Sequence, residues 1–245
     1  MIASLGMYDM PHLRDAHDRL WSGIRAALGH GPDHLTRDGD AWAEWQSPDL
    51  LLAQTCGLPF RARLHGKVTL VGTPVYDLPD CPAGHYFSYL IRRRSDARDL
   101  KTLSKQGIMA YNDALSQSGW AAPIAHLKNH GAHPRNTIRT DAHIASIEAV
   151  LSGAADYAGI DALTYLLWAQ VNPDMAQQID TFARTSPTPA LPYITALGRD
   201  PIPIANAIRS GIAALSANDR ATLRLKGLID IPASEYLALP IPPAP

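Results

Sequence analysis

The sequence predicts an α/β protein with a central mixed, mainly parallel sheet in each of two lobes. Short and nearly continuous apolar runs, such as 50–55 and 107–111, are typical of strands that are buried on both faces. Segments with apolar residues at helical spacing, such as 13–28 and 142–151, follow them and end at glycines. This alternation of buried strands and amphipathic helices favours the α/β class.

The individual elements follow from the same two patterns. The expected strands are residues 2–7, 50–55, 67–71, 86–91, 107–111, 136–139, 157–160, 179–184 and 193–196. The expected helices are residues 13–28, 60–64, 121–128, 142–151, 163–171 and 202–215, with a shorter helix after Ser216. Asp141 is a natural N-cap for the helix over 142–151.

Composition excludes several classes of function. The chain has 245 residues, 46% of them hydrophobic and 18% charged, and a net charge of −1. With a net charge this close to zero, the protein has no overall positive potential that would attract nucleic acid or an acidic membrane. The basic run 92–94 is interpreted as a solvated strand end. No apolar segment is long enough to span a membrane. Neither a metal-ligand spacing nor a nucleotide-binding fingerprint is present, so we expect no metal and no cofactor.

The compartment stays open at this point. Cys56 and Cys81 could form one disulfide or remain small buried side chains. The first residues read as a strand and not as a signal peptide. The protein is expected to be periplasmic if a leader was removed, and cytoplasmic otherwise.

Polar residues follow five of the expected strands. In open parallel sheets, ligands bind outside the carboxyl ends of the strands. The residues found there are Tyr8 and Asp9, Gln54 to Cys56, Asn112 to Ser118, Asp141 with His143, and Asp161. Together they predict a pocket for a polar ligand.

The stretch 111–120 is the strongest of these candidates. A strand leads into a turn that contains Ser116, Ser118 and Gly119, and a helix follows. The free N–H groups of a first helical turn, the hydroxyls and the helix dipole all favour a bound anion. Alternatively, one of the serines is simply the N-cap of the helix.

Three stretches in this order resemble the phosphate/phosphite/phosphonate substrate-binding proteins of ABC importers, which have the type II periplasmic-binding-protein fold. Residues 112–119 (NDALSQSG) are similar to the family's Ser-Thr-Ser-Gly turn. Residues 141–153 (DAHIASIEAVLSG) resemble its Gly-Ser-His segment with a helix and a glycine, and 155–162 (ADYAGIDA) resemble its Asp-Ala-Ala-Ala-Val-Asp strand. The likeness is clearest from 50 to 196.

The resemblance implies roles for individual residues. Ser116 and Ser118 would bind an anionic head group, and His143 would add a donor or a positive charge. Asp161 would face a second, cationic part of the ligand, and Tyr8 would form an aromatic wall in the other lobe. The predicted ligand-binding set is completed by Thr55, Asn112 and Gln117. Structural alternatives are a first-turn position for His143, an N-cap for Asp161 and a core position for Tyr8.

The sequence departs from the family pattern at three positions. Gln117 stands where threonine is usual, which removes a hydroxyl and adds an amide. Asp141 and Ala142 replace the usual glycine and serine. A carboxylate beside an anion pocket is unfavourable unless it points away.

We therefore expect two lobes, 1–78 with 187–245 and 79–186, with hinge crossings near 75–79 and 184–188. The protein would be a monomer that captures a small anion in the cleft by hinge closure, for an ABC permease or as a sensor. One alternative is a leaderless enzyme of the same fold, of the menaquinone- or thiamine-pathway kind, with Asp161 or His143 as general base. Another is a scaffold or partner-binding subunit.

Overall fold

The computed structural model describes all residues from 1 to 245 and divides them into two compact units. Unit 1 comprises residues 1–85 and 189–239, and unit 2 comprises residues 86–188 and 240–245. Residues 79–85, which the sequence analysis assigned to the second lobe, thus belong to unit 1. The strand before them stays bound within unit 1, since the Asp77 N–H donates to the Arg224 carbonyl at 2.7 Å. The hinge positions stay a prediction.

Unit 1 is built on a five-stranded sheet with the order β1-β2-β11-β3-β12. Its strands are β1 (Ile2–Ser4), β2 (Leu50–Gln54), β3 (Val68–Tyr76), β11 (Tyr193–Ala196) and β12 (Leu225–Ile229). Its helices are α1 (Arg14–Leu28), α2 (Ala41–Trp45), α3 (Gly57–Pro59), α9 (Pro201–Ala214), α10 (Ala217–Thr222) and α11 (Ala233–Leu237). Further helical turns are η1 (Gly6–Tyr8), η2 (Pro11–Leu13) and η3 (Phe60–Leu64).

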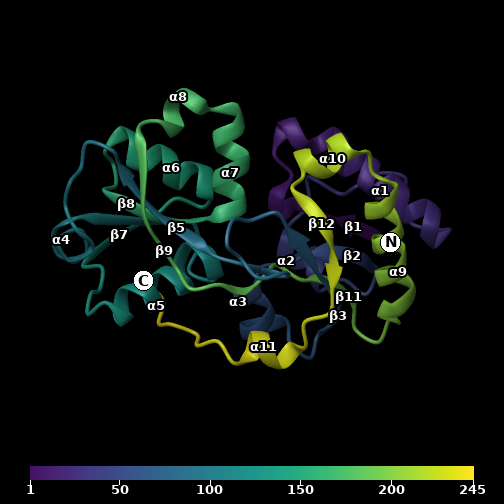
Figure 1. Cartoon of the computed structure of the whole chain (residues 1–245). Helices are drawn as coiled ribbons and strands as arrows, with labels where there is room; N and C mark the ends of the chain where they lie inside the picture. The colour runs from purple at the N-terminus through teal and green to yellow at the C-terminus, as the bar shows by residue number, and fades with distance from the viewer. The chain divides into compact units, whose positions relative to one another are not determined.

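Two layers of helix cover this sheet. One core brings Trp45 of α2, Phe60 and Leu64 of η3, and Tyr236 of α11 together with apolar side chains of β2, β3 and β11. Helices α1 and α9 pack against each other elsewhere in the unit (Figure 1), and Gly23 and Gly211 permit their close approach. A Cβ on Gly23 would lie 3.2 Å from the Gly211 Cα.

Unit 2 contains a second five-stranded sheet with the order β7-β6-β8-β5-β9. Its strands are β5 (Ser88–Arg93), β6 (Ile108–Tyr111), β7 (Asn136–Arg139), β8 (Tyr157–Asp161) and β9 (Ile179–Arg184). Its helices are α4 (Leu100–Gln106), η4 (Gln117–Ala121), α5 (Ala122–Asn129), α6 (His143–Ser152), α7 (Ala162–Val171) and α8 (Pro173–Ala176). Two short strands, β4 (His85–Tyr86) and β10 (Thr188–Pro189), pair where the chain passes between the units.

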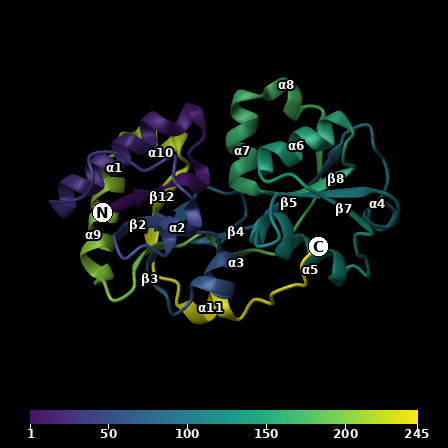
Figure 2. The same ribbon diagram turned by 180° about the vertical axis from the view of Figure 1, so that it is seen from behind.

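Alternate residues of β6 and β8 face two different cores, as the pleat of a strand requires. Ala110 and Ala158 pack with Ile147 and Val150 of α6 and Trp168 of α7. Met109 and Tyr157 pack with Leu103 of α4 and with Trp120 and Leu127 at the other face. The sheet therefore lies between α6 and α7 on one side and α4 and α5 on the other, as Figures 1 and 2 show from opposite sides.

The α/β class and the mixed sheets agree with the sequence prediction, but fewer strand pairs are parallel than expected. Only β1–β2, β6–β7 and β6–β8 are parallel, whereas β3, β5, β9, β11 and β12 pair antiparallel with their neighbours. A strand buried on both faces is a continuous apolar run in either orientation, so the sequence pattern does not separate them. None of the helices is both long and apolar enough to cross a membrane.

Candidate functional site

The turn between β6 and α5 has the local structure of a helix start. Ser116 is its N-cap, because its Oγ accepts a hydrogen bond from the Gly119 N–H at 2.9 Å. Gln117 and Ser118 are the first residues of η4, and both are buried. Their N–H groups occupy the first-turn positions that have no acceptor within the helix. The capping alternative for Ser116 is therefore correct, and its hydroxyl hydrogen is still able to donate to a ligand.

Ser118 and His143 lie in direct contact. The Ser118 Oγ is 2.8 Å from the His143 Nε2, although the two residues are 25 positions apart in the sequence. His143 is the first residue of α6. Burial lowers the pKa of His143 to about 4, and the backbone of Gly159 offsets this only in part. At neutral pH the pair therefore offers neutral groups to a ligand.

Ser88 of β5 forms a hydrogen bond with the backbone of this turn. Its Oγ donates to the Ser118 carbonyl at 2.8 Å. Within the helix, the Ala122 N–H donates to the Gln117 carbonyl, which is one residue before that of Ser118. At the same spacing, the donor to the Ser118 carbonyl would be residue 123, but Pro123 has no N–H. The Ser88 hydroxyl thus supplies the donor that the helix itself lacks, and it fixes the position of Ser118.

Two glycines let neighbouring groups approach this turn. A Cβ on Gly119 would overlap the side-chain oxygen of Asn112, and a Cβ on Gly159 of β8 would overlap Pro123. The Asn112 Oδ1 is buried and has no hydrogen-bond partner within the chain. An unpaired buried acceptor is costly, so it marks Asn112 as a group that is able to accept a hydrogen bond from a ligand or from water.

Asp161 lies at the carboxyl end of β8 and is buried, with 2% of its surface exposed. Its Oδ1 accepts from the Thr164 N–H at 2.9 Å, so Asp161 is the N-cap of α7. Asp161 also pairs across the sheet with Ser88. Residue 161 is thus connected through Ser88 to the turn at Ser118.

Asp141 does not cap α6, contrary to the sequence prediction. Ala142 is the N-cap residue, and the backbone of Asp141 has a positive φ of 64°. Its exposed carboxylate instead forms an ion pair with Arg139, with 2.7 Å between the Asp141 Oδ1 and the Arg139 Nε. Asp141, which replaces the glycine usual in the family, therefore has its negative charge paired with Arg139 and does not cap α6.

The two predicted residues of unit 1, Tyr8 and Thr55, are both buried. Tyr8 of η1 is buried and meets Tyr76 edge to face, with the ring centroids 5.3 Å apart. The Gln54 Nε2 donates to the Tyr76 hydroxyl at 3.1 Å. Thr55 is fully buried, and its Oγ1 has no hydrogen-bond partner within the chain. The structure therefore groups six of the eight predicted residues in unit 2 and places the other two in unit 1.

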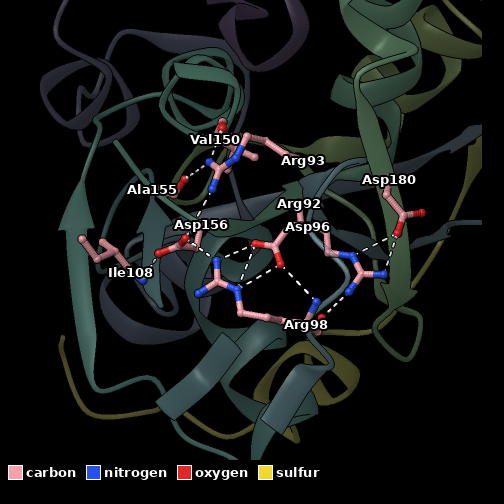
Figure 3. A network of polar contacts seen from close by, with 9 residues as sticks. All are labelled: Arg92, Arg93, Asp96, Arg98, Ile108, Val150, Ala155, Asp156 and Asp180. Carbon is pink, nitrogen blue, oxygen red and sulfur yellow. Dashed lines mark hydrogen bonds and ion pairs between the residues drawn. The ribbon is translucent and has the colours of Figure 1, made fainter. Parts of the chain in front are cut away.

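A network of charged side chains supports the strand that leads to the turn (Figure 3). Asp156 accepts from the Ile108 N–H at 2.8 Å, and its other oxygen pairs with Arg98 at 2.5 Å. Arg98 also binds Asp96, which lowers the pKa of that carboxyl to about 2. Arg93 joins the network through Asp156, at 3.3 Å, and also donates to two backbone carbonyls, one in α6 and one in the loop that follows it. The start of β6 is thus held by charge-assisted hydrogen bonds.

The sequence analysis did not select Ser88 or Tyr76. Ser88 contacts the site through a backbone carbonyl, for which no sequence motif exists. Tyr76 ends β3, which runs five residues past the end of the predicted strand. Tyr76 is recognised only from its contacts in the folded protein with Tyr8 and Gln54. No group of three or more His, Cys, Asp or Glu side chains is arranged to hold a metal ion.

Comparison with known proteins gives one family. The model of the family described as "ABC transporter, phosphonate, periplasmic substrate-binding protein" matches residues 51–235. A search of curated proteins found no match.

Solved structures of low sequence identity share the fold. The binding protein component of an ABC phosphonate transporter from Pseudomonas aeruginosa has 15% identity and a TM-score of 0.72, over 93% of this chain and 80% of that one. PhnD1 from Prochlorococcus marinus, in complex with methylphosphonate, has 16% identity and a TM-score of 0.73, over 96% of this chain and 94% of that one. A Xanthomonas citri protein bound to ATP has 13% identity and a TM-score of 0.69, over 97% and 96%.

Proposed function

The chain belongs to the family of periplasmic substrate-binding proteins of phosphonate ABC transporters, and on this premise we propose that it captures a phosphonate, phosphite or phosphate at the turn that contains Ser116 and Ser118. The observation that carries the proposal is the contact between the Ser118 hydroxyl and the His143 ring at a helix start. Neutral donors at a helix N-terminus hold an oxyanion without a lysine or arginine.

The Ser118–His143 contact has two possible proton arrangements. In one, the Ser118 hydroxyl donates to the Nε2; in the other, an Nε2–H donates to the Ser118 Oγ. The second arrangement leaves the serine hydrogen free for an anionic oxygen. We expect an oxyanion to select it, with Gln117 and the Ser118 N–H group as further donors.

The other predicted residues have distinct proposed roles. Asp161, which is buried at the carboxyl end of β8, would face a cationic part of the ligand. Asn112, whose Oδ1 is unpaired, would accept a hydrogen bond from a protonated ligand oxygen or from an amine. Tyr8 and Thr55 would be the contributions of unit 1. Hinge closure stays a prediction, and a fall in the radius of gyration on adding ligand would be its signature.

We propose binding without turnover. No carboxylate is hydrogen-bonded to the His143 ring, and its Nδ1 has no acceptor of good geometry. The pair thus lacks the orienting acid of a Ser-His-Asp triad. The family is one of transport proteins, which gives the enzyme alternative no support. The proposed partner is an ABC permease, and the proposed compartment is that of the family, the periplasm.

Thermal unfolding against a panel of anions tests this function. The panel contains alkyl- and aminoalkylphosphonates, phosphite, phosphate, sulfonates and small carboxylates. A ligand at about 100 times its dissociation constant stabilises by about 2.7 kcal/mol, which for a chain of this size is a rise in Tm of about 5–10 °C. We expect the rise with one class of phosphorus oxyanion, and unchanged phosphorus NMR signals of that ligand after long incubation.

Variants then locate the site. Ser118→Ala and His143→Ala should weaken binding of the selected anion, whereas Ser152→Ala, an exposed serine at the other end of α6, should not. Unchanged affinity in both of the first two variants would reject the proposed head-group site. A shift for carboxylates only would reject the phosphorus oxyanion as ligand.

A further inference from the structure

Two histidines lie side by side at the end of α5 that is opposite the anion-binding turn. His126 and His130 are four residues apart, so they occupy the same face of the helix. Their ring centroids are 4.3 Å apart and the ring planes are inclined by only 31°. His126 is half-buried and His130 is exposed. Neither ring forms an ion pair with a carboxylate.

The tautomer of His130 leaves one of its nitrogens available. The His130 Nδ1 lies 2.8 Å from the backbone carbonyl of His126. A carbonyl only accepts, so the Nδ1 carries the hydrogen and the Nε2 keeps its lone pair. Metal-binding histidines commonly donate their second ring N–H to a backbone carbonyl in this way, which fixes the ring orientation.

The surroundings of the pair favour a bound cation. His130 is the C-cap residue of α5. The C-terminal end of a helix carries partial negative charge and stabilises cations. The same helix thus offers its positive end to an anion and its negative end to a metal ion.

We propose that His126 and His130 form a two-histidine site for a first-row divalent cation. Imidazole is a common ligand of copper, nickel and zinc, and we expect the site to bind Cu²⁺ more tightly than Ni²⁺ or Zn²⁺. No third His, Cys, Asp or Glu completes the ligand set. Water fills the remaining positions, so the cation is exchangeable. The proposal does not depend on the identity of the anion.

Calorimetric titration of the whole protein with Cu²⁺, Ni²⁺ and Zn²⁺ in a non-coordinating buffer at pH 7.5 tests the site. Mutation of a residue that merely hydrogen-bonds a metal ligand typically weakens metal affinity by about 10-fold or more. Loss of one of the two histidine ligands should weaken Cu²⁺ binding at least as much. The variants are His130→Ala, which alters an exposed side chain, and His126→Gln. The matched control is His133→Ala, whose Nδ1 also lies near a carbonyl, at 3.0 Å from Pro134 O, but which follows the end of the helix.

The expected result is one Cu²⁺ site that both variants weaken and that the control keeps, with nitrogen couplings from two imidazoles in the electron paramagnetic resonance spectrum. Unfolding without metal checks that the variants are folded. Undiminished Cu²⁺ affinity in both variants, equal loss in His133→Ala, or no binding at millimolar Cu²⁺ would overturn the proposal. Each of these results leaves the anion titration of Ser118→Ala unaffected, so the two proposals fail separately.

Discussion

The hydroxyl of Ser88 donates a hydrogen bond to the carbonyl of Ser118 across 2.8 Å, and both residues are buried. One residue comes from the first strand of unit 2 and the other from the turn that we assign to the ligand. Because Pro123 cannot donate to this carbonyl, Ser88 is its substitute donor. The sheet therefore sets the position of the Ser118 side chain, which contacts His143.

Removing this donor should weaken binding without touching the ligand. Ser88→Ala leaves a buried carbonyl unpaired, which costs about 1–3 kcal/mol. If this cost destabilises the turn conformation that binds the anion, the affinity for the selected anion should fall by about tenfold for each 1.4 kcal/mol. Calorimetric titration and urea unfolding measure the two effects. Ser104→Ala removes another buried serine hydroxyl, bound to Lys101 O within α4, and should spare the affinity. Equal affinities of the Ser88 variant and the unaltered protein would disprove the positioning role.

The close approach of β8 to the turn should make Gly159 intolerant of a side chain. A Cβ there would overlap Pro123 and lie 3.2 Å from the Ser118 carbonyl. Overpacking of this kind typically costs about 1–3 kcal/mol, so Gly159→Ala should unfold at a lower urea concentration and bind the anion more weakly. Gly227→Ala, in β12, is the control because its Cβ meets no atom within 4 Å. Similar stability of the two variants would contradict the tight packing at Gly159.

The parts of the site that the sequence predicted follow local rules. Ser116 and Asp161 cap helices, and both capping serines and capping aspartates are recognisable a few residues before an apolar periodic segment. Strands such as β2 and β7 were predicted to within one residue because a short apolar run between turn residues is distinctive. The prediction of the fold succeeded for the same reason.

The remainder depends on contacts between distant residues. The contact between Ser118 and His143 was not predicted, since nothing local relates positions 25 apart; only the family resemblance implied that both residues bind the same head group. Helix α4 and strand β12 were not predicted: α4 has only seven residues, and β12 is a short strand that is interrupted by Gly227 and lacks a regular alternation of buried residues. Asp141 was misassigned as a cap because its carboxylate pairs with Arg139, and ion pairs compete with capping in ways that a sequence does not reveal.

The ionisation of His143 should be visible directly. Since burial lowers its pKa to about 4, the imidazole NMR signals should titrate near pH 4 and not near the ordinary value of about 6.5. The unfolded chain takes up this proton first as the pH falls. Stability from the neutral ring is therefore complete above about pH 6.5 and is lost progressively toward pH 4. His143→Asn should flatten the stability profile in that window, and the exposed His133→Asn should not. A midpoint near 6.5 would contradict the buried neutral ring.

The charged network before β6 should contribute more stability than an ordinary surface ion pair. Burial raises the pKa of Asp156, but the Ile108 N–H and the Arg98 guanidinium lower it further, and the net pKa is below its usual range. Asp156→Ala removes acceptors from a backbone N–H and from two arginines, so we expect a loss of about 2–3 kcal/mol in urea unfolding.

Asp180 provides the comparison within the same region. Its carboxylate pairs with Arg92 at 2.8 Å and is about one-third exposed, at 34%. Asp180→Ala should cost only about 0–1 kcal/mol. The Asp96 carboxyl, with a pKa of about 2, adds a pH signature: its stabilisation is present above about pH 3.9 and is lost as the pH falls toward 2. Equal losses in Asp156→Ala and Asp180→Ala would show that the network does not hold β6.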